Sequence, residues 1–159
     1  DCCFELLSAQ ISAGANIAKI FDSWAGSLSP TMLQRASVDP IRRIVMRLKE
    51  KHPETPVIVF PRGIGPLYPE FCRSVEPHAV AIDQGLPLEW ASNAIRGNVT
   101  LQGNLDPIYL TGPKSPLERE LEVIKAAMSG KPHIFNLGHG ITPDAKIENV
   151  SFALEYIRS

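Results

Sequence analysis

The chain has 159 residues, of which 44% are hydrophobic and 21% are charged, as in an ordinary globular domain. Lys and Arg number 16 and Asp and Glu number 17, so the net charge is −1. This balance disfavours nucleic-acid and membrane-surface binding, which usually show as a basic excess. No apolar run approaches the ~20 residues that a membrane span needs. We therefore expect a partner that is neither nucleic acid nor membrane.

The cysteines indicate a reducing compartment. Cys2, Cys3 and Cys72 are odd in number, two of them are adjacent, and none belongs to a C-x-x-C pair. That pattern disfavours both a disulfide framework and a zinc site. The first residues also lack the basic and apolar regions of a signal peptide. We predict a cytoplasmic protein without a metal site.

Helices and strands are predicted to alternate along the first half of the chain. Helices are identified by apolar residues at i, i+3, i+4 and i+7, and strands by short β-branched or aromatic runs. The predicted elements are a helix over 4–11 that Gly14 ends, a strand at 16–22, a helix at 40–53, a strand at 56–60 and a weaker helix at 68–75.

The alternation continues in the second half. The predicted elements are a strand at 79–83, a short helix at 87–95, a strand at 98–102, a helix at 115–128, a strand at 133–137 and a last helix over 150–157. Ser115, Pro116 and Glu118 match a helix start, with Ser115 as N-cap and Glu118 completing a capping box.

A helix followed by five strand–helix units, without a hairpin signal, predicts an α/β fold with a parallel sheet. A doubly wound sheet and a (β/α)8 barrel both fit this order, although no G-x-G-x-x-G follows the first strand. A complete barrel needs about 250 residues. Because the chain also begins with Asp1, we interpret residues 1–159 as part of one barrel whose N-terminal part is missing.

Polar residues follow every predicted strand. In a parallel barrel, the functional side chains come from the C-terminal ends of the strands. A glycine stands close to each of these ends and allows a sharp turn there. The residues at these ends are Asp22, Ser23, Arg62, Asp83, Asn104, Asp106 and His139.

Four of these residues are also compatible with simpler roles. Asp83 is compatible with capping the next helix, and Asp106, which precedes Pro107, with starting a turn or helix. Arg62 fits a solvated loop cation. From spacing alone, Ser23 fits best as a turn serine that bonds to the backbone.

Only one of the four histidines lies at the expected functional end. His52 precedes Pro53 at a helix end, and His78 and His133 precede strands at the opposite rim. His139 follows the last strand between two glycines. It is therefore the best single candidate for a functional residue.

Three segments of the chain resemble the uroporphyrinogen decarboxylases. Residues 21–26 are similar to the family's F-D-S-W-A-G segment, residues 102–107 to its Q-G-N-L-D-P segment, and residues 136–143 to its N-L-G-H-G-I-x-P segment. The resemblance implies a (β/α)8 barrel that works as a homodimer in heme biosynthesis. It implies decarboxylation of the acetate arms of uroporphyrinogen III to coproporphyrinogen III without a cofactor. It also implies that this chain is the C-terminal part.

The resemblance assigns roles to two residues. Ser23 matches the serine that contacts the carboxylate arms of the substrate, and His139 matches the histidine at the tetrapyrrole pocket. We therefore expect both to bind substrate, and His139 also to serve catalysis. Arg62 as a further substrate-binding cation is our own hypothesis from its position after a strand. The remaining strand-end residues form a second tier: Asp22, Asp83, Asn104 and Asp106.

The family's invariant aspartate, its arginine loop and its substrate-binding tyrosine have no counterpart in this chain, and we expect them upstream. Two other interpretations stay open. A corrinoid-dependent methyltransferase of the same superfamily would hold zinc, typically through an H-x-C pair, which this sequence lacks. A partial barrel with open sheet edges would instead be a non-catalytic fragment.

Overall fold

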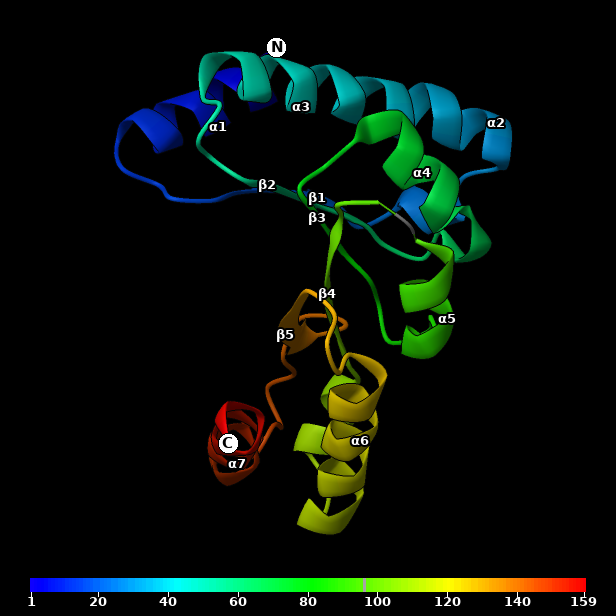
Figure 1. Ribbon diagram of the computed structural model, residues 1–159, viewed down its shortest axis with the longest axis vertical. Helices are drawn as coiled ribbons and strands as arrows, with labels where there is room; N and C mark the ends of the chain where they lie inside the picture. Colours follow the sequence, from blue (N-terminus) through cyan, green and yellow to red (C-terminus); the bar gives the residue numbers. More distant parts are fainter. Residues whose placement is uncertain (96) are drawn as a thin grey trace. The chain divides into compact units, whose positions relative to one another are not determined.

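Five parallel strands alternate with helices in the computed structural model, which describes residues 1–95 and 97–159 (Figure 1). The strands are β1 (Ala18–Asp22), β2 (Val57–Pro61), β3 (Ala79–Ala81), β4 (Thr100–Leu105) and β5 (His133–Leu137). The α-helices are α1 (Cys2–Ser12), α2 (Pro30–Leu33), α3 (Asp39–Lys51), α4 (Tyr68–Val75), α5 (Leu88–Ala94), α6 (Lys114–Ala127) and α7 (Ile147–Arg158). Among the described residues, none of these helices is long and apolar enough to cross a bilayer.

The chain divides into two compact units. Unit 1 comprises Asp1–Ala81 and Ile95–Thr100, and unit 2 comprises Ile82–Ala94 and Leu101–Ser159. Unit 1 therefore contains β1, β2 and β3, whereas β5 and nearly all of β4 belong to unit 2.

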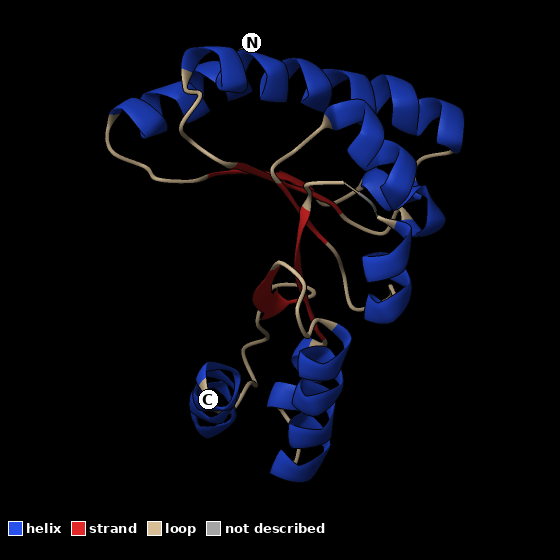
Figure 2. Cartoon of the chain, viewed as in Figure 1, coloured by secondary structure: helices blue, strands red, loops and turns tan. Residues whose placement is uncertain are grey.

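Unit 1 is a three-stranded parallel sheet with helices along one face (Figure 2). In its register, Ala18 pairs with Val57 and Ile58 pairs with Ala79. All residues of β2, the middle strand of the three, are buried. Helix α3 buries the apolar stripe that the sequence predicted, so the core forms where this helix contacts α1 and α4.

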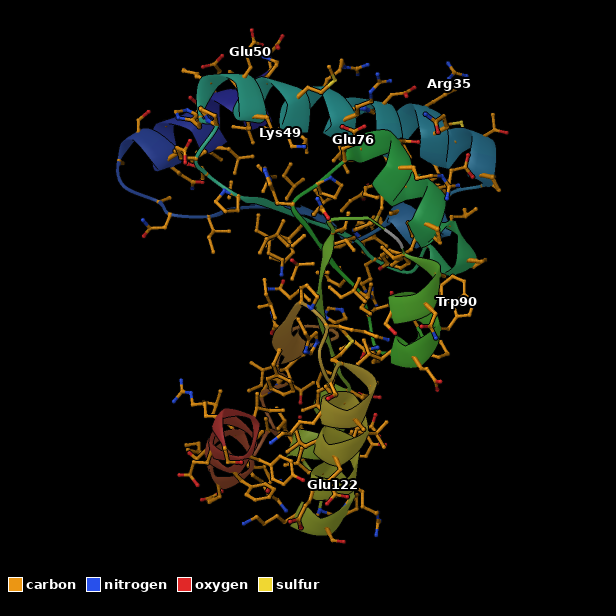
Figure 3. The ribbon with its side chains drawn as sticks, in the orientation of Figure 1. Arg35, Lys49, Glu50, Glu76, Trp90 and Glu122 are labelled. Carbon is orange, nitrogen blue, oxygen red and sulfur yellow. The ribbon has the colours of Figure 1, made fainter. Side chains whose placement is uncertain are left out.

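His78 ties β2 to the segment before β3. The Nδ1 atom of its ring accepts a hydrogen bond of 3.0 Å from the Val57 backbone N–H. The backbone N–H of His78 donates to the Val57 carbonyl at 3.1 Å. Nearby, the Lys49 ammonium donates to the Glu76 carbonyl, which links the end of α3 to the end of α4 (Figure 3). Burial, and secondarily the charge of Lys49, lower the pKa of His78 below its usual value of 6.5.

We predict that His78 makes the stability of the protein pH-dependent. The unfolded chain binds a proton at higher pH than folded His78 does, so stability falls as pH drops from 6.5 toward the folded pKa. A His78→Asn variant keeps a hydrogen-bond acceptor but does not titrate. Urea unfolding midpoints at pH 7.5 and 5.5 should therefore differ less in His78→Asn than in the wild type. Equal pH dependence in both proteins would contradict the assignment.

Unit 2 contains the parallel pair β4 and β5. Leu101 pairs with His133, and Asn104 pairs with Asn136. Ile82, directly after β3, donates its N–H to the Gln102 carbonyl at 2.9 Å. Helix α6 packs against α5 and α7, and the side chains that it buries are Leu117, Leu121 and Ile124.

Two cations reinforce the packing between α6 and α7. The ammonium of Lys114 lies 3.7 Å from the centre of the Phe152 ring, and that of Lys125 lies 5.2 Å from the centre of the Tyr156 ring. Such contacts stabilise by about 0.5–1 kcal/mol at exposed sites. They supplement the buried apolar stripe of α6 rather than replace it.

The structure corrects two predicted boundaries in unit 2. Strand β4 starts at Thr100 and ends at Leu105, three residues beyond the predicted end, because the polar residues that suggested a turn are buried within the strand. Helix α6 begins at Lys114 with Pro113 in the N-cap position. The capping box with Ser115 as N-cap is therefore wrong, and the Ser115 hydroxyl instead lies 3.4 Å from Arg119 Nη1.

The helical segment before residue 40 escaped the sequence prediction. Helix α2 starts at Pro30, continues as a π-helix over Gln34–Val38, and leads directly into α3. Pro40 occupies the N1/N2 position of α3, directly after the π-helical turn. The proline that suggested a helix start therefore lies inside a longer helical run.

Candidate functional site

The turns after β1 and β2 bring together Asp22, Ser23 and Arg62 in unit 1. Asp22 and Pro61 are register partners at the ends of their strands. The Arg62 N–H donates to the Asp22 carbonyl at 3.1 Å, and the Gly26 N–H donates to the Arg62 carbonyl at 2.9 Å. The backbone therefore fixes these two turns against each other, while the Ser23 side chain remains exposed.

Gly26 is required for this close approach. A Cβ atom at this position would lie 2.4 Å from the Gly63 carbonyl oxygen, much closer than real contacts allow. Trp24, in the same turn, is 77% exposed. The turn after β1 thus exposes the hydroxyl of Ser23 and the indole of Trp24 to solvent.

One face of unit 1 carries a lysine and two phenylalanines that the sequence reasoning missed. The Lys19 ammonium lies 4.7 Å from the centre of the Phe21 ring and 5.6 Å from that of Phe60. The two rings meet edge to face, and Phe21 is 64% exposed. Burial lowers the pKa of Lys19 below 10.5. The available signal was a lysine two positions before a phenylalanine in a strand, which places both on the same face.

In unit 2, Asp83 and Asp106 form local hydrogen bonds with the backbone. The Asp83 carboxylate accepts the Gly85 N–H at 2.9 Å and shapes the loop after β3. The Asp106 carboxylate accepts the Ile108 N–H at 3.0 Å and caps the 3-10 helix Pro107–Leu110. The Asp106 contact is that of the simpler helix-start role, whereas the Asp83 contact is that of a turn within the loop.

His139 lies in the turn after β5 and is exposed. Its Nδ1 accepts the Gly140 N–H at 2.5 Å, which leaves Nε2 as the outer ring atom. Gly138, immediately before it, is buried and donates its N–H to the Leu105 carbonyl at 2.8 Å. The turn after β5 is therefore held against the end of β4 within unit 2.

Unit 2 also contains a cavity of about 840 Å³, whose lining includes Asn104, Asp106, Tyr109 and Glu120. The charge of Glu120 and, secondarily, burial and a hydrogen bond to that carboxylate raise the pKa of Tyr109. His139 is not among the residues that line the cavity. Among residues 1–95 and 97–159, no three His, Cys, Asp or Glu side chains cluster in a way that could hold a metal ion.

Solved structures with the same arrangement define the fold class. A methyltransferase from Methanosarcina mazei matches 98% of this chain with a TM-score of 0.80, at 16% identity and over 45% of its own length. A putative vitamin-B12-independent methionine synthase from Listeria monocytogenes matches with a TM-score of 0.67, at 11% identity and over 51% of its length. The prediction of parallel β/α units that form part of a barrel is confirmed.

Sequence comparisons then give the family. The family model described as uroporphyrinogen decarboxylase (URO-D) matches residues 1–159, so the chain belongs to the uroporphyrinogen decarboxylase family. The chain is 48% identical over 154 residues to the uroporphyrinogen decarboxylase of Paracoccus denitrificans, covering 97% of the chain and 45% of that protein. It is 41% identical over 153 residues to that of Rickettsia rickettsii, covering 94% and 43%. The chain thus spans a little less than half the length of these relatives.

Proposed function

We propose that the complete protein carrying this chain decarboxylates the acetate side chains of uroporphyrinogen III to give coproporphyrinogen III in heme biosynthesis. The observation that supports this proposal is the match of the family model to all 159 residues. The relatives that are 41–48% identical carry the name of this enzyme. By contrast, the methyltransferase with a similar fold is only 16% identical, so the corrinoid-dependent alternative has weaker support.

We propose that Ser23 and Arg62 in unit 1 and His139 in unit 2 bind the carboxylates of the substrate. A serine hydroxyl and a neutral imidazole N–H each donate a neutral hydrogen bond, whereas a guanidinium donates a charge-assisted bond that is roughly twice as strong. The turns that carry Ser23 and Arg62 are joined by backbone hydrogen bonds, which supports a shared task. Asp22, Asp83 and Asp106 remain secondary candidates, whereas the amide of Asn104 donates to two backbone carbonyls.

The proposed chemistry uses the substrate itself as the electron acceptor. Protonation of the pyrrole carbon next to the one that bears the acetate arm creates a cationic ring. The bond between the methylene and the carboxylate then breaks, CO₂ leaves, and the electron pair neutralises the ring. A second proton converts the exocyclic methylene to a methyl group, and loss of the first proton restores the pyrrole. The protein has to hold the macrocycle, pair its carboxylates and supply protons.

We further propose that this chain is the C-terminal part of a single barrel and that the complete enzyme is a cytoplasmic homodimer. Three family features without a counterpart here, an aspartate, an arginine loop and a tyrosine, are expected in the other part. The 159 residues alone should therefore be inactive.

A hybrid protein tests the proposal directly. In this hybrid enzyme, the chain replaces the matching 154 residues of the Paracoccus denitrificans relative, which restores full length. We expect the hybrid enzyme to release CO₂ from uroporphyrinogen and to form coproporphyrinogen at a rate within about tenfold of the parent. A folded hybrid without CO₂ release, beside an active parent, would overturn the proposal.

A further inference from the structure

Asn104 holds the loop that follows β3. Its side chain is buried, and its amide nitrogen donates to the carbonyl oxygens of Asp83 at 3.1 Å and Leu86 at 2.7 Å. The amide therefore donates one hydrogen bond to each end of the four-residue loop 83–86. Within that loop, the Leu86 N–H donates to the Asp83 carbonyl at 3.2 Å. Without Asn104 the Asp83 carbonyl keeps the Leu86 N–H, but the buried bond to the Leu86 carbonyl is lost, which is costly, so the loop conformation depends on Asn104.

The approach of β4 to this loop is unusually close. Gly103 has a φ of +131°, and a Cβ there would lie 2.6 Å from the Ile82 carbonyl oxygen. Glycine at this position lets the strand approach the backbone that leads into the loop. The adjacent Asn104 is thereby brought within hydrogen-bonding distance of both carbonyls.

The same loop contacts the backbone before His139. A Cβ on Gly138 would lie 2.3 Å from the Gln84 backbone nitrogen and 2.9 Å from its Cα atom. Gly138 is buried, and its N–H is bonded to the Leu105 carbonyl at 2.8 Å. The residue before His139 is therefore fixed between the end of β4 and the loop that Asn104 holds.

We propose that Asn104 is a positioning residue for His139, acting through the loop Asp83–Leu86 and the contact between Gln84 and Gly138. The inference rests on the proposed function, in which His139 binds the substrate. It differs from a substrate-binding role for Asn104, because the amide group of Asn104 is already used by two backbone carbonyls. Loss of these bonds displaces the loop, and the displacement reaches His139 through Gly138.

A matched pair of variants in the hybrid enzyme tests this role. Asn149 is also buried in unit 2 and donates its amide to two carbonyls, those of Leu110 and Gly112, both at 3.0 Å. Asn104→Leu and Asn149→Leu each remove two such bonds, so both should lower the melting temperature. Only Asn104→Leu should lower kcat/KM per folded molecule by about tenfold or more, because small displacements of reacting groups are costly. Equal kcat/KM losses in both variants would refute the proposal.

A double-mutant cycle with Gly138→Ala adds a second test. The added methyl group meets the Gln84 backbone and should displace the same contact. If both changes act on this contact, the combined loss in kcat/KM for Asn104→Leu with Gly138→Ala is smaller than the product of the separate losses. Independent multiplication of the two losses would mean that Asn104 does not act through Gly138.

The imidazole signal of His139 reports its position without any turnover. In ¹³C-histidine-labelled hybrid enzyme, His139→Gln assigns the signal by its disappearance. Asn104→Leu and Gly138→Ala should shift that signal, whereas Asn149→Leu should leave it in place. An inactive hybrid that shows these shifts would contradict the proposed function but support the positioning role. An unmoved His139 signal in both Asn104→Leu and Gly138→Ala would overturn the positioning role, whatever the activity.

Discussion

Replacing His139 by Gln in the hybrid enzyme should lower kcat/KM for uroporphyrinogen by about 100-fold or more, while the melting temperature changes little. The loss follows from the proposed role of its imidazole Nε2 as a hydrogen-bond donor and proton-transfer group. Stability should persist because the side chain is exposed and accepts its hydrogen bond from the N–H of the adjacent Gly140. Steady-state kinetics and thermal unfolding measured on the same preparation check both parts of the prediction.

His52 provides the control for this substitution. Its ring lies 2.9 Å from the Ser8 hydroxyl and belongs to no strand end. His52→Gln should leave kcat/KM within about twofold of the parent hybrid. If His139→Gln is as active as His52→Gln, His139 has no role in binding or catalysis.

Replacing Gly26 by Ala should destabilise the protein by about 1–3 kcal/mol, as overpacking of a close contact does. The new Cβ would lie 2.4 Å from the Gly63 carbonyl oxygen, and both partners are backbone, so no side chain can move aside. The turns that carry Ser23 and Arg62 must then separate. Urea unfolding should show the destabilisation. Activity per folded molecule should also fall, because the side chains of Ser23 and Arg62 change position relative to each other.

Gly112 is the matched control for the Gly26 substitution. A Cβ on Gly112 would meet nothing within 4 Å, and its φ is not in the left-handed region. Gly112→Ala should therefore change stability by less than about 0.5 kcal/mol. If Gly26→Ala is as stable and as active as Gly112→Ala, the contact between the two turns does not position the site.

The sequence by itself determined the order of strands and helices and the positions of most candidate residues. Apolar periodicity located α3, and β-branched runs located β2, because these patterns reflect the burial of one face or of both. The polar residues Ser23, Arg62 and His139 were found from their positions after strands. The three family segments supplied an identity that periodicity alone left open between two parallel architectures.

Only the tertiary structure decided which polar residues act on the backbone and which face solvent. Carboxylate and amide side chains often bind ligands. The structure nevertheless shows that those of Asp83, Asn104 and Asp106 form hydrogen bonds with the main chain. The close approaches of Gly26 to Gly63 and of Gly138 to Gln84 join residues at least 37 positions apart. No local sequence pattern can predict such contacts. Glycine is required there because a Cβ atom would collide with the backbone of a turn that is distant in the sequence.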